Sequence, residues 1–126
     1  MTGKELMLYS MDLCGLLDEN GEACNDTKDL QQRALSLINI TLAENGILDC
    51  NIRKIKHSIP RIHRLDDPID CSDVICYRVL PYGVARLMML GEDDALAADF
   101  GRLYSQGQES AARFGKAVTH QIKEVY

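Results

Sequence analysis

The side chains best suited to chemistry in this chain of 126 residues are its cysteines and histidines. The five cysteines are odd in number and irregularly spaced, with no Cys-x-x-Cys pair and no histidine at zinc-finger spacing. Such a set is typical of free thiols in a reducing compartment rather than of a metal centre. The residues in question are Cys14, Cys24, Cys50, Cys71, Cys76, His57, His63 and His120.

A second candidate for chemistry consists of His57, His63 and the pair Asp66-Asp67. These types could act as acid and base or as metal ligands. Their spacing follows no rule for either role, so they carry no chemical prediction. We therefore expect a protein that is not an enzyme, with no catalytic residue, no bound metal and no cofactor.

The composition predicts one domain with an ordinary hydrophobic core. Hydrophobic residues make up 46% of the chain, and its length suits a single domain spanning residues 1–126. No apolar run approaches the roughly 18–20 residues of a membrane span, and Lys4 and Glu5 precede only a short apolar stretch, unlike a signal peptide. We expect a soluble protein made in a cytoplasm, without a membrane partner.

Apolar residues at helical spacing predict two helices in the first part of the chain. The first opens with a capping box, in which Thr2 caps the helix and Glu5 reaches back. It ends at residues 18–21, where an Asn-Gly pair predicts a loop rather than a hairpin, because no alternating strands flank it. The second spans roughly residues 28–45 and ends at Gly46, since glycine readily adopts the left-handed conformation that closes a helix.

Residues 47–70 break the helical pattern and predict an irregular, extended connector. Their isoleucines are unevenly spaced, and Pro60 and Pro68 interrupt them. The part from 51 to 64 contains no acid, and a connector of this length inside a compact domain is unusual without a function. The basic residues of the connector are Arg53, Lys54, Lys56, Arg61 and Arg64.

The densest apolar run lies between residues 79 and 100, and the rest of the chain is expected to pack around it. A third helix begins after Asp70 or Ser72 and either kinks or restarts at Pro81, because proline removes a backbone donor and crowds the preceding turn. Gly91 ends it, and three acids open the fourth helix at the end that favours negative charge. The predicted core residues of this region are Leu80, Val84, Leu87, Leu90 and Phe100.

The fourth helix carries apolar residues three, four and seven apart, which is typical of antiparallel helix packing. This pattern weakens over residues 119–126, a tail expected to be flexible or to lie extended on a partner. Its candidate assembly contacts are Ile122, Val125 and Tyr126. Together the patterns predict an all-α fold, a small bundle of about four helices with an irregular basic connector before the third.

Several short segments of the chain form a pattern through their sequences and their order. The strongest is Leu80-Pro81-Tyr82-Gly83-Val84-Ala85, followed by the apolar run 87–90, the acids at 92–94, and Phe100 with Tyr104. Shorter segments are residues 2–6, the Ile38-Asn39 region, 65–69 and 122–126. In this order, over most of the chain, they resemble the head–tail connector proteins of tailed phages.

The resemblance implies a small α-helical adaptor, or head-completion protein, at the head–tail junction of a virion. Such proteins form a ring, usually dodecameric, beneath the portal protein, extend the channel for packaged DNA and present a surface to the next neck or tail protein. The implied partners are further copies of the chain, the portal, a neck or tail completion protein and the packaged DNA. The basic connector and the Cys71–Cys76 region have no counterpart in the family pattern.

The basic connector could line the DNA channel, dock on an acidic portal surface or be a solvated loop. The net charge of -5 argues against a general nucleic-acid-binding protein. A channel must also let DNA slide without sticking, so contact with the portal is favoured. The alternative function is a small helical regulatory or DNA-associated protein of a mobile element.

Overall fold

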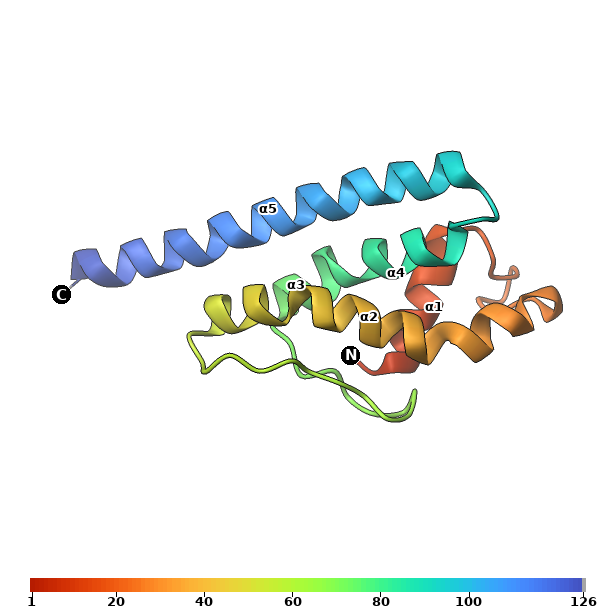
Figure 1. The fold of residues 1–126 in the computed structure, drawn as a ribbon, viewed down its shortest axis with the longest axis horizontal. Helices are drawn as coiled ribbons and strands as arrows, with labels where there is room; N and C mark the ends of the chain where they lie inside the picture. The colour runs from red at the N-terminus through yellow and green to blue at the C-terminus, as the bar shows by residue number, and fades with distance from the viewer. Residues whose placement is uncertain (126) are drawn as a thin grey trace.

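The computed structural model describes the backbone of residues 1–125 and the side chains of residues 1–115 (Figure 1). In this part of the chain the regular structure is helical, without a β-strand, which confirms the predicted all-α fold. The four predicted helices correspond to α1, α2, the pair α3 and α4, and α5. The elements are α1 (Gly3–Leu13), the 3₁₀ turn η1 (Asn25–Thr27), α2 (Lys28–Arg53), α3 (Asp73–Arg78), α4 (Leu80–Met89) and α5 (Asp94–Val125).

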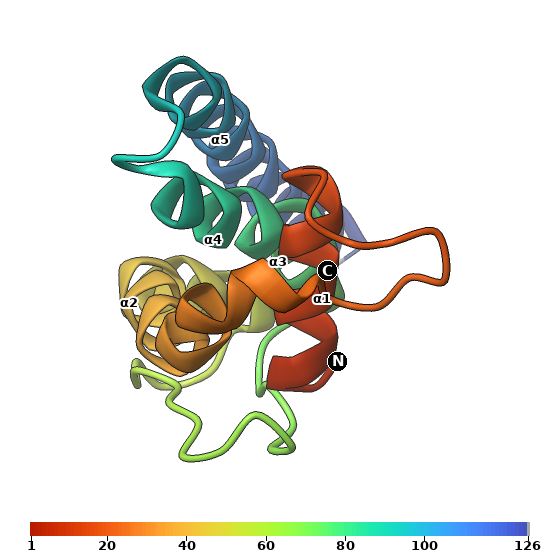
Figure 2. The same cartoon turned by 90° about the vertical axis from the view of Figure 1, so that its right-hand side faces the viewer.

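Helix α4 is the centre of the fold. It lies between α5 and α2 in Figure 1, and Figure 2 shows α1 beside it on a further side. A helix that is apolar nearly all round must be covered by several neighbours, and Leu80 and Val84 are fully buried, as predicted. Phe100 of α5 is also buried, whereas Leu87 is half-buried and packs against the core.

The prediction that Leu90 belongs to the core is wrong, because its side chain is 65% exposed. The last residue of α4 is Met89, and Leu90 caps the helix with an extended backbone. Gly91 then takes a φ of +87°, which glycine adopts easily, and the chain turns towards α5. The apolar run continues to Leu90 in the sequence, but the helix that would have buried it has already ended.

A partly buried polar network joins α2, α4 and α5. Asn45 of α2 donates to the hydroxyl of Tyr104 at 2.7 Å, and that hydroxyl donates to Glu44 at 3.2 Å. Gln108 donates to the side-chain oxygen of Asn45 at 3.0 Å, and the guanidinium of Arg86 lies 5.1 Å from the centre of the Tyr104 ring. Burial raises the pKa of Tyr104 to about 12. Because its polar groups find partners on other helices, the network holds α2 and α5 in one register.

Helix α2 does not end at Gly46, as predicted, but continues to Arg53. Gly46 is buried, and an added Cβ would lie 3.2 Å from the carbonyl oxygen of Ser58. Its missing side chain therefore lets the connector pack against α2 instead of closing the helix. The left-handed residue that ends α2 is Lys54, with a φ of +58°. Residues 47–53, which we expected to be extended, are helical.

The connector is irregular, as predicted, but it comprises residues 54–72. It is held against the body by specific hydrogen bonds. The side-chain amide of Asn39 donates to the carbonyl oxygen of Ile62 and accepts from its N–H, both at 3.0 Å. The carbonyl oxygen of Leu65 accepts from the N–H of Lys4 at 2.8 Å. The connector is thus attached to both α2 and α1.

Local chemistry explains the other boundaries. Thr2 caps α1 as predicted, with its hydroxyl oxygen accepting from the N–H of Glu5 at 3.2 Å. Helix α1 ends earlier than expected, at Leu13, because the chain turns at Gly15, which has a φ of +72°. Of the two alternatives for the third helix, a restart is observed, with Pro81 in the first turn of α4.

Helix α5 continues through residues 119–125, so the backbone of the predicted tail is helical rather than extended. The side chains of Ile122 and Val125, and all of Tyr126, lie outside the described residues. Among the helices described, none is both long enough and apolar enough to cross a bilayer.

Replacing Gly83 with alanine should lower the free energy of unfolding by about 1–3 kcal/mol, because overpacking a core forces its neighbours apart. The added methyl would lie 2.7 Å from both Thr41 Cγ2 and Tyr104 Cε1. Gly101→Ala is the matched control, since its nearest neighbour would be Arg86 Cδ at 3.4 Å. It should stabilise the protein by up to about 1 kcal/mol through helix propensity. Urea denaturation measures both, and equal effects would contradict the close approach at Gly83.

The raised pKa of Tyr104 predicts a loss of stability in alkali. The phenol ionises near pH 10 in an unfolded chain and at about 12 in the fold. Its contribution is therefore complete below pH 10 and is lost as the pH rises through 12. Tyr104→Phe should cost about 1–2 kcal/mol at neutral pH and remove this part of the pH dependence. Free energies of unfolding measured against pH test this, and parallel curves for the two proteins above pH 10 would contradict it.

Candidate assembly surfaces

Arg53, the first of the five predicted contact residues, is an internal anchor. Its guanidinium lies 2.6 Å from Oδ2 of the fully buried Asp49 and 2.8 Å from Oδ1 of Asp70. The other oxygen of Asp49 accepts from the N–H of Ser72 at 2.7 Å. Desolvation opposes the charge of Arg53, but the hydrogen bond to Asp70 and the charge of Asp49 outweigh it and raise the pKa of Arg53. The group ties the last turn of α2 to the residues that precede α3.

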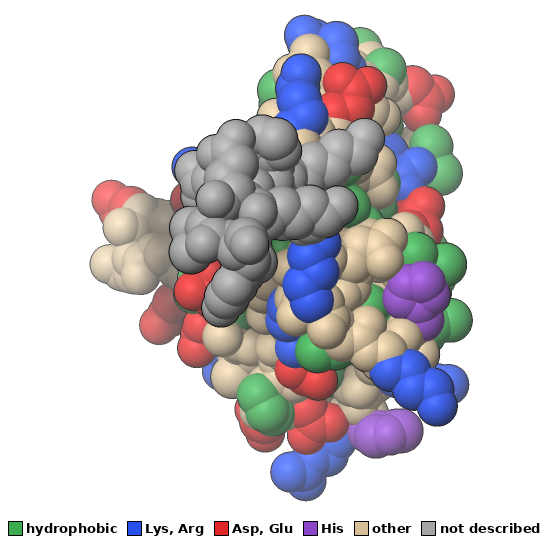
Figure 3. Space-filling model, turned by 90° about the vertical axis from the view of Figure 1, so that its left-hand side faces the viewer, with side chains coloured by type: hydrophobic (Ala, Val, Ile, Leu, Met, Phe, Trp, Pro, Cys, Tyr) green, Lys and Arg blue, Asp and Glu red, His purple; other side chains and the backbone are tan. Residues whose placement is uncertain are grey.

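The other four basic residues are exposed, and we call them the connector cations. None forms an ion pair with another residue of the described chain. Figure 3 views the end of the molecule where α2 finishes and shows basic and histidine side chains on it, with acidic side chains among them. Ile55 and Ile59 are 45% and 67% exposed, so apolar side chains accompany the charges. The connector cations are Lys54, Lys56, Arg61 and Arg64.

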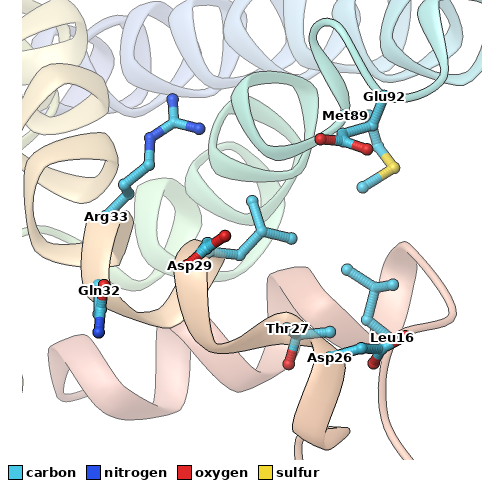
Figure 4. A pocket seen from close by; sticks show the side chains of 9 residues that line it. Leu16, Asp26, Thr27, Asp29, Gln32, Arg33, Met89 and Glu92 are labelled. Carbon is cyan, nitrogen blue, oxygen red and sulfur yellow. The ribbon is translucent and has the colours of Figure 1, made fainter.

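A pocket of about 620 Å³, the acidic pocket, lies at the opposite end, where α2 begins (Figure 4). Its walls come from the loop after α1, from η1 and the first turns of α2, and from the turn after α4. It presents three carboxylates and one guanidinium around apolar side chains. The acids form no ion pair among the described residues. The lining residues used below are Leu16, Leu30, Met89, Asp26, Asp29, Arg33 and Glu92.

Sequence reasoning missed the acidic pocket, although a signal was present in two places. Residues 12–29 carry six acids and one lysine, and residues 92–94 are three further acids. The acids of residues 12–29 were interpreted as capping and loop residues, and those of residues 92–94 as the start of the fourth helix. Only the packing of α4 beside α2 brings the two segments to one pocket.

A shallow apolar groove runs between α5 and the segments α3 and α4. Tyr77, Tyr82 and Leu103 line it, and Phe114 with Tyr77 lines an adjoining depression. Tyr77 and Phe114 are 49% and 52% exposed, and Arg78 lies beside them in both hollows. The residues of this aromatic surface come from separate helices, and the fold brings them together.

The cysteine, histidine and aspartate side chains considered for chemistry do not come together in one site. The cysteines of the described chain are free, and burial raises the pKa of Cys14 to about 11, which suppresses thiolate reactivity. The described part holds no group of three or more His, Cys, Asp or Glu side chains suited to a metal ion. His57 pairs with Asn51 at 2.9 Å, and Asp67 accepts from the N–H of His63 at 2.9 Å. These contacts organise the connector. His120 lies outside the residues whose side chains are described.

No protein-family model matches the chain, and comparisons with curated proteins and with solved structures find no relative. What the protein does must therefore be argued from its own residues.

Removing the charge of Arg53 should destabilise the protein far more than removing that of Lys56. Arg53→Gln leaves Asp49 buried without its cation, which we expect to cost about 2–4 kcal/mol. Lys56→Gln changes an exposed side chain and should cost less than about 0.5 kcal/mol. Chemical denaturation compares the two, and an Arg53 variant as stable as the Lys56 variant would show that Asp49 does not need this partner.

Proposed function

We propose that the protein is a structural head–tail connector, the adaptor of a tailed phage or prophage that assembles as a ring beneath the portal. The ring would extend the channel for packaged DNA and offer a docking surface to a neck or tail completion protein. Its partners are further copies of itself in a dodecameric ring, the portal, that completion protein and the DNA that passes through. It works at the head–tail junction of the virion, after assembly in the host cytoplasm.

The observation that carries this proposal is the ordered resemblance centred on residues 80–85. These residues begin α4, where Pro81 lies in the first turn and Gly83 admits Thr41 and Tyr104. The segments that resemble the family therefore include residues with packing roles at the centre of the fold. A resemblance at such positions supports a common architecture more strongly than one in a surface loop would.

The exposed surfaces suit a protein whose function is contact. Lys54 and Lys56 follow the last residue of α2, Arg61 and Arg64 lie further along the connector, which bonds to the middle of α2 and to α1, and the acidic pocket lies where α2 begins. Charged groups that form no internal ion pair can steer docking and set its orientation when a partner carries the opposite charge. We assign the connector side of the molecule to the portal, because its cations would complement an acidic portal surface.

The same cations favour a second candidate, a small helical regulatory or DNA-associated protein of a mobile element. Contacts with phosphates would make such binding strongly salt-dependent. The net charge of -5 and the acidic pocket oppose it, because a negative protein field repels DNA. Binding to duplex DNA in a mobility-shift assay, without binding to the portal, would favour this second function.

Neutralising the connector cations should weaken binding to the portal by about tenfold or more at low salt, because complementary charges steer and orient docking. The difference from the wild-type protein should shrink at high salt, where exposed charges are screened. Arg53 is left unchanged, because it anchors Asp49. The variant combines Lys54→Gln, Lys56→Gln, Arg61→Gln and Arg64→Gln.

The matched control removes the same number of exposed positive charges from other parts of the molecule and should bind the portal normally. A pull-down with the portal protein of the same phage compares the two variants with the wild-type protein. Equal binding by both variants would refute the role of the connector, and no binding by the wild-type protein would refute the proposed function. The control residues are Lys28, Arg78, Arg102 and Arg113.

A further inference from the structure

We infer that the acidic pocket of one copy receives the start of the connector, residues 54–59, of the next copy. The inference rests on the proposed function, since it names the repeating contact of the ring. It also divides the connector between two partners. Lys54 and Lys56 would enter the neighbouring pocket, whereas Arg61 and Arg64 would remain available to the portal.

The two surfaces lie at opposite ends of α2 and cannot meet within one chain. Asp26 and Asp29 stand at the start of this helix, whereas Lys54 follows its last residue. A helix of 26 residues is about 39 Å long. Figure 1 shows the start of α2 on the right of the molecule and its end on the left. A contact between the surfaces therefore needs a second copy.

Charge complementarity identifies the occupant. Asp26, Asp29 and Glu92 have no ion-pair partner within the described chain, and neither do Lys54 and Lys56. Pairing across two copies would therefore break no internal ion pair. Like charges placed across an interface are costly. The three carboxylates of the pocket outnumber its one guanidinium, that of Arg33, so the pocket disfavours an acidic partner and favours a basic one. The connector is the basic segment that every further copy carries.

The apolar side chains complement one another as well. Leu16, Leu30 and Met89 line the pocket, while Ile55 and Ile59 of the connector are 45% and 67% exposed. Docking would remove apolar groups from water on both sides, which favours association. The pocket volume of about 620 Å³ falls within the size of pockets that bind small ligands and side chains.

The geometry of the contact is heterologous, because one face of the molecule meets a different face of the next. Such contacts generate a closed ring when the rotation between copies returns to the start, and an open filament when it does not. An open chain of copies retains one free connector at one end and one free pocket at the other until the assembly closes. An antiparallel two-fold dimer could also use both surfaces, with each connector in the other copy's pocket, and sedimentation would show it as a closed pair instead of a larger ring.

Zero-length cross-linking tests the contact on the wild-type protein. A water-soluble carbodiimide condenses a carboxylate with an amine into an amide and takes up the released water as a urea. Normal and heavy-isotope-labelled copies, mixed at high concentration and low salt, should give peptides that join Lys54 or Lys56 of one copy to Asp26, Asp29 or Glu92 of the other. Absence of these mixed-isotope peptides, while other carboxylate–amine cross-links form, would overturn the inference.

Charge reversal provides the second arm. Lys54→Glu with Lys56→Glu, or Asp26→Lys with Asp29→Lys, should each lower self-association by about tenfold or more in sedimentation velocity, because each creates like-charge contacts. Mixing the two variants should restore association between them. Circular dichroism verifies that each variant is folded, and Lys4→Glu with Arg113→Glu is a control of equal charge change. Failure of the mixture to associate, or an equal loss in the control, would overturn the inference.

The result also separates this inference from the proposed function. A ring that forms on the portal with the reversed connector, Lys54→Glu with Lys56→Glu, would overturn the contact and leave the connector function standing. Cross-links at the predicted residues in a protein that does not bind its portal would support the contact and refute that function.

Discussion

Helix α4 can be covered by its neighbours because Gly83 lets its backbone approach Thr41 of α2 and Tyr104 of α5. Once Tyr104 is buried, its hydroxyl needs partners, and it receives them from Asn45 and Glu44 of α2. A glycine and a tyrosine thus hold three helices together at one place. The remaining elements depend on this contact, because it fixes the position of α2 against α4 and α5.

The continuity of α2 separates the two surfaces on which the proposed assembly depends. The Asn-Gly pair in the middle of α2 serves packing instead of terminating it, so the helix reaches Arg53 and the Asp49–Arg53–Asp70 group secures the following connector. The start of the connector and the acidic pocket are consequently separated by the full length of the helix. In the proposed ring, this separation would let each copy present opposite charge to two different neighbours.

Features determined by neighbouring residues could be predicted from the sequence, including the all-α fold, the Thr2 cap and the break near Pro81. Features determined by distant residues could not. The pair Asn45-Gly46 is typical of a helix end, but the contact with Ser58 determines the role of Gly46. Leu90 continues an apolar run of the sequence, although α4 ends at Met89. The acidic pocket escaped prediction because its acids come from two segments that only the tertiary fold joins.

The central claim is that this protein works by assembling on a portal. Electron microscopy of the purified protein mixed with the portal protein of the same phage tests it most directly. The account predicts a ring of additional helical density, coaxial with the portal and with copies joined head to tail, at the end from which DNA leaves. Portal particles that remain unchanged when the protein is present in large excess at low salt would contradict it.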